Sequence, residues 1–116
     1  MRLLKLLEFI ITEDNEYKLF FSKKYKKLIV KYSNKPANIK LLRDLEKSLL
    51  HNGDISGHGI HSINQPIKSE YTGKDEKGWK VVYVSKSDDL RLGYYRHKDK
   101  TIEVKFGKAS DIGYKH

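Results

Sequence analysis

Three segments in the C-terminal part of the chain have apolar patterns typical of β-strands. Residues 79–84 form a nearly continuous apolar run, as expected of a central strand that is covered on both faces. Residues 90–96 and 101–106 alternate apolar and polar positions, as strands do when one face is buried. In the last segment this alternation predicts that Glu103 and Lys105 point to solvent. The three segments together predict an antiparallel meander.

Two shorter segments near the N-terminus are also rich in β-forming residues. They span residues 8–12 and 17–21, and the Asp14-Asn15 pair between them is a turn signal, so they predict a β-hairpin. A second interpretation stays open for the first arm. Apolar residues from Leu3 onward have helical spacing, so a short helix could extend through it instead.

After Ser22 the apolar period changes from that of a strand to that of a helix. Apolar residues at i, i+3, i+4 and i+7 define one helix face, which consists of Tyr25, Leu28, Ile29 and Tyr32. Ser22 can cap the start of this helix. Pro36 suits the first turn of a second amphipathic helix, and Gly53 can take the left-handed conformation that ends it. The short link between them predicts an antiparallel helical hairpin.

The segment between the second helix and the meander is rich in glycine. Residues 53–78 therefore predict a loop, with room for a short strand within residues 60–71. The order of elements predicts an α+β fold, in which an N-terminal strand and a two-helix hairpin pack on a small antiparallel sheet. A length of 116 residues fits a single domain over residues 1–116.

The charge of the chain is strongly positive and unevenly distributed. The formal net charge is +9, from 24 lysines and arginines against 15 acidic residues. Residues 17–36 hold seven lysines and no acid, whereas residues 1–16 hold two bases and four acids. Such clustering favours a polyanionic partner such as nucleic acid or an acidic protein. The residues expected to form this patch on the first helix are Lys23, Lys24, Lys27 and Lys31, although exposed helix lysines are often only solvated.

Several classes of function are excluded or disfavoured by composition. The chain has no cysteine, so it has no disulfide, no catalytic thiolate and no thiolate metal ligand. No apolar run approaches the roughly 20 residues needed to span a bilayer. The leucine-rich start is interrupted by Lys5 and Glu8 and is not followed by a cleavage site of small residues, so we do not expect a signal peptide. These features favour a cytoplasmic protein.

Cationic and aromatic residues share the second face of the predicted sheet. If the helices cover the apolar face, the other face presents Arg91, Tyr95 and Lys105, beside a tail that carries Tyr114 and His116. Cations of this kind meet phosphates and rings stack on bases, so the pattern is compatible with RNA binding. An ordinary solvated sheet face has the same alternation, and the two interpretations stay open on this pattern alone.

Four segments between about residue 17 and residue 114 together have a pattern found in one known family. They are Tyr17-Lys18-Leu19-Phe20-Phe21-Ser22-Lys23-Lys24, Trp79-Lys80-Val81-Val82-Tyr83-Val84, Leu90-Arg91-Leu92-Gly93-Tyr94-Tyr95-Arg96, and Thr101-Ile102-Glu103-Val104-Lys105-Phe106-Gly107-Lys108, closed by Asp111-Ile112-Gly113-Tyr114. With these segments, most of the chain resembles the RelE/ParE superfamily of toxins of type II toxin–antitoxin systems. The resemblance implies a sheet like that of microbial RNases, with residues 1–16 as an N-terminal extension. It also implies cleavage of mRNA in the ribosome and neutralisation by a cognate antitoxin protein.

The resemblance also implies roles for individual residues. Arg91 matches a sheet arginine that contacts the scissile phosphate, and Lys108 matches a basic residue after the last strand. Tyr114 matches the tail tyrosine that stacks on the base or assists proton transfer. Lys80 matches a basic position on the preceding strand, and His116 resembles the histidine of similar tails.

Cleavage of RNA through its own 2′-OH needs a base, an acid and cations, but no metal ion or other cofactor. Lys80, Arg91, Lys105 and Lys108 could supply the cations, and Tyr114 and His116 could move protons. Glu46 is the best helical carboxylate for a base, but we expect it to lie on a solvated face near Arg43.

One histidine cluster has spacing that metal sites use. It consists of His51, Asp54, His58 and His61, with His58 and His61 in an H-x-x-H pattern. In a glycine-rich loop without cysteine this is a weak zinc signal, so we expect no metal site. A loop that binds a nucleotide or ribosomal RNA, or an inert polar loop, explains the cluster better.

Three functions follow from these observations. The leading prediction is a ribosome-dependent endoribonuclease toxin with mRNA, the ribosome and an antitoxin as partners. The second is a non-catalytic protein that binds RNA or the ribosome. The third is a ParE-like toxin of the same fold that inhibits gyrase, since a fold does not fix a function.

Overall fold

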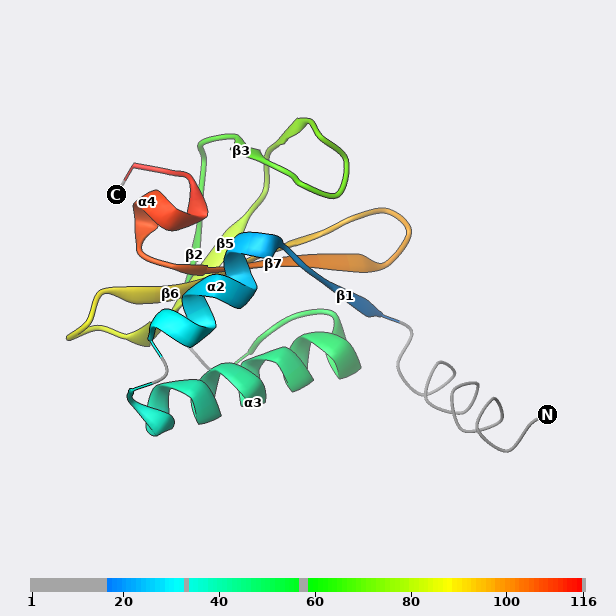
Figure 1. The fold of residues 1–116 in the computed structure, drawn as a ribbon. Coiled ribbons are helices and arrows are strands. Elements are labelled where there is room, and N and C mark those ends of the chain that lie inside the picture. The colour runs from blue at the N-terminus through cyan, green and yellow to red at the C-terminus, as the bar shows by residue number, and fades with distance from the viewer. Residues whose placement is uncertain (1–16, 33, 57–58, 116) are drawn as a thin grey trace.

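The computed structural model describes residues 17–32, 34–56 and 59–115, and Figure 1 shows their arrangement. In chain order the elements are β1 (Lys18–Phe21), α2 (Lys23–Lys31), α3 (Pro36–Asn52), β2 (Ile60–Ser62), β3 (Ile67–Lys68), β4 (Asp75–Glu76), β5 (Lys80–Ser85), β6 (Leu90–Arg96), β7 (Thr101–Gly107) and α4 (Ala109–Ile112). The predicted α+β class is confirmed. The first arm of the predicted hairpin, residues 8–12, lies outside the described residues.

The sheet is mixed rather than purely antiparallel. Its five strands follow the order β1-β7-β6-β5-β2, and the meander of β5, β6 and β7 is antiparallel as predicted. However, β1 runs parallel to β7, with Lys18 opposite Thr101 and Phe21 opposite Val104. The prediction of an antiparallel sheet was wrong at this edge, because β1 pairs with the last strand of the meander.

Both predicted helices form, and their ends lie at the predicted capping residues. The Oγ of Ser22 accepts a hydrogen bond from the Tyr25 N–H at 3.1 Å, which fixes the start of α2. Helix α3 begins at Pro36 and ends at Asn52, and the next residue, Gly53, caps it with a left-handed φ of 73°. The chain reverses between α2 and α3, and both helices lie along the sheet (Figure 1).

The two helices cover one face of the sheet, and the main core lies between the helices and the sheet. Its deeply buried residues include Leu42, Leu45 and Leu49 of α3, Leu92 of β6, and Ile102, Val104 and Phe106 of β7. The predicted inward positions of β7 are therefore confirmed. We call this side of the sheet the helix face.

The opposite face of the sheet is also covered, contrary to the sequence prediction. A second apolar cluster lies there and consists of Ile67, Trp79, Val81, Ala109, Ile112 and Tyr114. The segment that contains β3 and the short helix α4 lie on this side (Figure 1). We call it the tail face. Sequence alternation describes the strands alone, so it missed the loop and the tail that fold onto them.

Glu103 shows how completely this face is covered. It was expected to point to solvent, but it is 0% exposed. Its carboxylate accepts hydrogen bonds from Ser69 Oγ at 2.5 Å and from the Glu70 N–H at 2.7 Å, and His97 Nε2 lies at 3.0 Å. Lys105 was expected to be solvated too, but its side chain is largely buried, with Nζ at 3.8 Å from Glu103. A buried carboxylate satisfied in this way holds the loop against the sheet.

Two glycines allow α4 to lie on the tail face. A Cβ on Gly93 would meet Ile112 Cγ2 at 3.1 Å, so the strand has no room there for a side chain. Gly107, with φ of 133°, turns the chain from β7 into α4. Among the described residues, no helix is both long enough and apolar enough to cross a membrane.

Candidate functional site

A pocket of about 330 Å³ opens on the tail face around Arg91. Its lining residues come from β2, β5, β6, the loop after β2 and the C-terminal tail: His61, Ile63, Val81, Tyr83, Arg91 and Tyr114. Two of the predicted catalytic residues, Arg91 and Tyr114, thus meet in one pocket. We call it the Arg91 pocket.

The guanidinium of Arg91 is held in a fixed position. The residue is only 1% exposed. Its Nη2 donates to the Tyr83 hydroxyl at 2.9 Å and lies 3.0 Å from a carboxylate oxygen of Asp89. Its Cζ lies 4.8 Å from the centre of the Tyr83 ring and 6.0 Å from that of the Tyr114 ring. Arg91 is therefore a positioned cation between two rings, partly neutralised by one carboxylate.

Tyr114 reaches the pocket because the chain turns after α4. Gly113 adopts φ of 113°, and the Tyr114 N–H donates to the Ala109 carbonyl at 3.1 Å. Burial raises the pKa of the Tyr114 hydroxyl, although the nearby Arg91 cation opposes this. The hydroxyl therefore keeps its proton at neutral pH, so it can donate a proton or stack but cannot act as a base.

Sequence reasoning missed the roles of two lining residues. Tyr83 belongs to the apolar run 79–84, which predicted only a central strand covered on both faces. Its hydroxyl holds Arg91, and the strand register explains this because Tyr83 lies opposite Arg91. His61 was considered as a weak metal ligand and as part of a nucleotide-binding or inert polar loop, but not as a member of the catalytic set. It lies exposed on β2 and lines the Arg91 pocket. A prediction of the strand register between β2, β5 and β6 would have found both.

The two predicted catalytic lysines lie outside the Arg91 pocket. Lys108 lies at the N-terminal end of α4 and lines another pocket, of about 420 Å³, with Tyr32, Lys35 and Asp88 among its residues. Lys80 lies in register with Tyr94, which belongs to the core of the helix face, so its side chain is on the other side of the sheet. His116 lies outside the described residues.

Tyr95 and Lys105, predicted to bind nucleic acid, take part in packing. Both contact Trp79: the Tyr95 ring at 5.2 Å between centroids, and Lys105 Nζ at 5.4 Å from the ring centroid. Tyr95 also lies 4.8 Å from the His97 ring. These contacts leave little of either side chain for a base or a phosphate.

The predicted lysine patch on α2 is exposed. The outward positions of this helix hold Lys23, Lys24, Lys27 and Lys31, while Tyr25 and Leu28 are buried. Lys24 lies 3.6 Å from Asp111 of α4, and Lys31 Nζ lies 5.3 Å from the Tyr32 ring centroid. The patch is thus a positive surface at the helix rather than part of the Arg91 pocket.

Glu46 has a structural environment that the sequence did not indicate. It was expected on a solvated face, but it is 7% exposed. Its carboxylate accepts hydrogen bonds from the Tyr25 hydroxyl and from Arg43 Nη1 at 2.8 and 2.9 Å, and the proximity to Arg43 was predicted. Because both oxygens are engaged and buried, Glu46 is not available as a base for a substrate.

The histidine cluster is not assembled in the part of the chain that the structure describes. No group of three histidine, aspartate or glutamate side chains there could hold a metal ion. His58, half of the H-x-x-H pattern, lies outside the described residues. Asp54 instead accepts hydrogen bonds from Tyr94 and from the Ile55 N–H.

Comparison of the chain with family models, with curated proteins and with solved structures finds no match in any of the three. The resemblance to RelE/ParE toxins therefore rests on the residues quoted above, and it stays a prediction.

Proposed function

We propose that this chain is an endoribonuclease that cleaves mRNA on the ribosome, with the Arg91 pocket as its active site. One observation carries the proposal. A buried arginine, a protonated tyrosine and an exposed histidine line the same pocket, and they come from three separate parts of the chain. These are the cation and the proton-transfer groups that cleavage through the 2′-OH requires.

The proposed reaction uses the chain's own residues and the 2′-OH of the RNA. The 2′-oxygen attacks phosphorus, the bond from phosphorus to the 5′-oxygen breaks, and the products are a 2′,3′-cyclic phosphate and a 5′-hydroxyl. His61 accepts the 2′ proton, because histidine is the side chain best suited to proton transfer near neutral pH. The Tyr114 hydroxyl donates a proton to the leaving oxygen. The imidazolium then returns its proton to the tyrosinate.

Arg91 stabilises the charge that develops on the phosphoryl oxygens. Tyr83 acts as a positioning residue, since its hydroxyl fixes the guanidinium. The rings of Tyr83 and Tyr114 flank the same guanidinium and offer faces on which a splayed base can stack.

The partners follow from charge. The exposed lysines of α2 form a positive surface that suits the phosphates of ribosomal RNA. A net charge of +9 also favours an acidic protein as the antitoxin that keeps the enzyme inactive.

A non-catalytic RNA-binding protein is the second candidate, and one observation favours it. Lys80 and Lys108 line other pockets, so Arg91 is the single lysine or arginine among the lining residues, and Asp89 pairs with it. A site with one partly neutralised cation can bind a phosphate without cleaving next to it.

The test is a translation reaction supplied with the purified protein, in which mRNA 5′ ends are mapped by primer extension. The first variant is His61→Gln, with His51→Gln as its matched control because both histidines are exposed. The second variant is Arg91→Met, which keeps the buried aliphatic stem and removes the charge. Circular dichroism of each variant checks that the fold is intact.

Cuts within ribosome-bound codons that persist in His51→Gln and are lost in folded His61→Gln and Arg91→Met would support the proposal. Cuts that persist in His61→Gln would remove His61 from the reaction. Intact mRNA with the wild-type protein, while ribosomes translate, would overturn the nuclease. RNA binding lost in Arg91→Met would then favour the binding protein, and altered DNA supercoiling would favour the gyrase inhibitor.

A further inference from the structure

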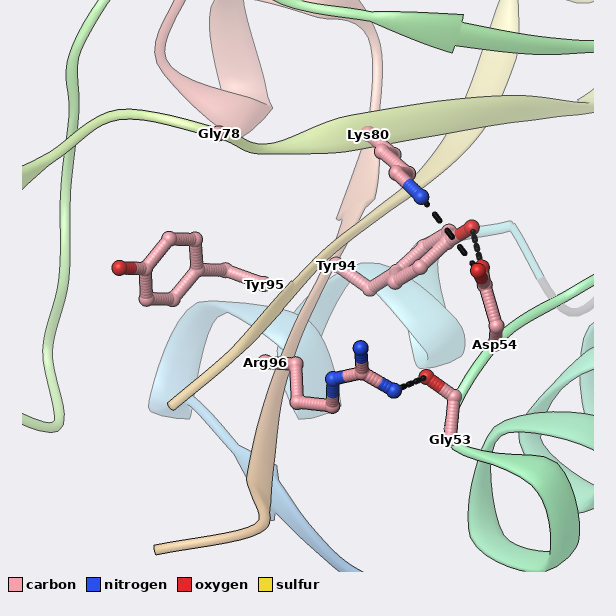
Figure 2. A pocket seen from close by; sticks show the side chains of 7 residues that line it. All are labelled: Gly53, Asp54, Gly78, Lys80, Tyr94, Tyr95 and Arg96. Carbon is pink, nitrogen blue, oxygen red and sulfur yellow. Dashed lines mark hydrogen bonds and ion pairs between the residues drawn. The ribbon is translucent and has the colours of Figure 1, made fainter. Parts of the chain in front are cut away.

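A third pocket, of about 190 Å³, lies on the helix face at the end of α3, and Figure 2 shows it. Its lining residues are Gly53, Asp54, Gly78, Lys80, Tyr94, Tyr95 and Arg96. Lys80, Tyr94 and Arg96 come from β5 and β6, while Gly53 and Asp54 follow α3. In Figure 2 the Lys80, Tyr94 and Asp54 side chains converge, whereas the Tyr95 ring points away from them.

The two oxygens of the Asp54 carboxylate differ in their hydrogen-bond partners. Oδ1 accepts hydrogen bonds from the Tyr94 hydroxyl at 2.6 Å and from the Ile55 N–H at 2.8 Å. Oδ2 has a single partner in the described part of the chain, Lys80 Nζ at 3.4 Å. Burial opposes ionisation of Asp54, but the bonds from Tyr94 and Ile55 and the charge of Lys80 outweigh it and lower the pKa. Asp54 is therefore a fixed, ionised acceptor with an oxygen to spare.

Two cations line the pocket beside this acceptor. In the part of the chain that the structure describes, Lys80 Nζ makes only the long contact to Asp54, and its side chain is 40% exposed. Arg96 Nη1 donates to the Gly53 carbonyl at 3.3 Å, which orients a guanidinium that is otherwise exposed. Two positive charges against one negative charge leave the pocket net positive. An anion can therefore bind both cations while Asp54 stays ionised.

The backbone keeps the pocket open and fixes Arg96. Gly53 and Gly78 have φ of 73° and 105°, conformations that side chains rarely adopt, and neither adds bulk to the pocket wall. The Tyr17 ring packs directly on Gly53, where a Cβ would lie 2.4 Å from Tyr17 Cζ. The Arg96 guanidinium lies 5.8 Å from the centre of that ring, so the ring supports it.

We propose that this pocket binds the phosphate and ribose of a ribonucleotide. The phosphate accepts hydrogen bonds from Lys80 and Arg96, and a ribose hydroxyl donates to Asp54 Oδ2. A volume of about 190 Å³ is below that of pockets that enclose a drug-sized ligand, so the pocket takes this polar part and leaves the base outside. Because Lys80 and Arg91 lie on opposite faces of the sheet, this site is separate from the Arg91 pocket and independent of the proposed nuclease.

The test is a titration followed by the amide resonances of Gly53 and Gly78, since glycine amides fall in an uncrowded part of the NMR spectrum. The probes are uridine 5′-monophosphate, inorganic phosphate and uridine. We expect the nucleotide to shift both glycine resonances, phosphate to do so at higher concentration, and uridine to have little effect. Tetrauridylate with and without a 5′-phosphate distinguishes the end of an RNA chain from a free nucleotide as the source of the group.

The variants separate the roles of the two charges. Lys80→Gln and Arg96→Gln should each weaken nucleotide binding by about tenfold, because each removes a charge-assisted hydrogen bond. Asp54→Asn should tighten phosphate binding and remove the preference for the nucleotide over phosphate. Lys98→Gln, in the exposed turn between β6 and β7, is the control with the same charge change and should bind like the wild type.

The proposal fails if the glycine resonances do not move, or if Lys98→Gln weakens binding as much as Lys80→Gln. It also fails if Asp54→Asn keeps the preference for the nucleotide. A titration repeated in Arg91→Met must give the same affinity as the wild type. A loss there would show that the nucleotide binds at the Arg91 pocket instead.

Discussion

Asp89 is the residue on which the chemistry of the Arg91 pocket depends most. It has φ of 61°, a left-handed conformation that non-glycine residues seldom adopt. Its side chain is 55% exposed, yet its carboxylate reaches the buried Arg91 at 3.0 Å. A carboxylate in this position competes with any phosphate for the guanidinium. Under the proposed function, Asp89 therefore sets how strongly Arg91 attracts RNA.

The substitution Asp89→Asn should increase RNA affinity about three- to tenfold, because it removes the exposed carboxylate that competes with a phosphate for the buried guanidinium. Fluorescence anisotropy with a labelled RNA measures the effect. Asp75→Asn, an exposed acid on β4, is the control and should change affinity far less. If the two variants bind alike, Asp89 does not compete with the phosphate. If the double variant Asp89→Asn/Arg91→Met does not show the increased RNA affinity, Asp89 acts through Arg91.

At the scale of elements, the position of α4 on the sheet depends on the backbone conformation of Gly107. Gly107 has φ of 133°, and a Cβ there would lie 2.7 Å from the Cβ of Asp111. The Asp111 carboxylate in turn accepts the Lys108 N–H at 3.0 Å and so holds the first turn of α4. A side chain at Gly107 would both strain the turn and push α4 off the sheet.

Gly107→Ala should lower the free energy of unfolding by about 2 kcal/mol or more, because strain and overlap act together. Urea denaturation measures this difference. Gly59→Ala is the matched control: a Cβ there meets no atom within 4 Å, so its effect should stay within about 0.5 kcal/mol. If the two substitutions lower the free energy of unfolding equally, a side chain at Gly107 does not displace α4.

The elements that sequence predicted correctly are those whose own pattern determines them. Helices α2 and α3 have a full apolar face and clear end signals at Ser22, Pro36 and Gly53. The meander strands are long enough for their continuous or alternating apolar patterns to be recognised. In contrast, β3 and β4 have two residues each and α4 has four, too few for any period to show. They form because tertiary contacts, such as those of Glu103, hold them in place.

The candidate site was predicted in part for the same reason. Arg91 and Tyr114 were found because the resemblance pointed to them, and the structure brings them together. Lys80 was predicted to act with them, but successive residues of a strand point to opposite faces of the sheet. Lys80 therefore lies on the face away from the Arg91 pocket. His61 lies on a three-residue strand whose partner could not be deduced from a glycine-rich loop. The face that a residue occupies is a property of the register, which the sequence leaves open.

At the scale of the whole molecule, two buried tyrosines connect stability to pH. Burial and a hydrogen bond to Glu46 raise the pKa of Tyr25 above its ordinary value, and burial and a hydrogen bond to Asp54 do the same for Tyr94. In the unfolded chain both hydroxyls lose their protons near pH 10. Because the folded state retains these protons, alkaline solution favours unfolding.

The free energy of unfolding should be unaffected by these groups below about pH 9, and each tyrosine should lower it by about 1.4 kcal/mol per pH unit above about pH 10. Denaturant titrations between about pH 8 and 12, roughly the range in which tyrosines of unfolded peptides ionise, measure how the free energy of unfolding changes with pH. Tyr25→Phe should be less stable at neutral pH but should show a shallower slope. Tyr94→Phe should likewise show a shallower slope, because burial raises the pKa of Tyr94 as well. A wild-type slope in Tyr25→Phe would show that this hydroxyl does not couple folding to pH.

The parallel pairing of β1 with β7 has a consequence for how the chain folds. The two strands lie side by side, yet Thr101 follows its partner Lys18 by about 80 residues in the chain. Closing so large a loop costs entropy before any contact compensates for it, and folds rich in such distant contacts form slowly. During synthesis β1 stays an unpaired edge until β7 leaves the ribosome. The growing chain is therefore exposed to aggregation for most of its translation, and the sheet is completed only after nearly every other element has been made.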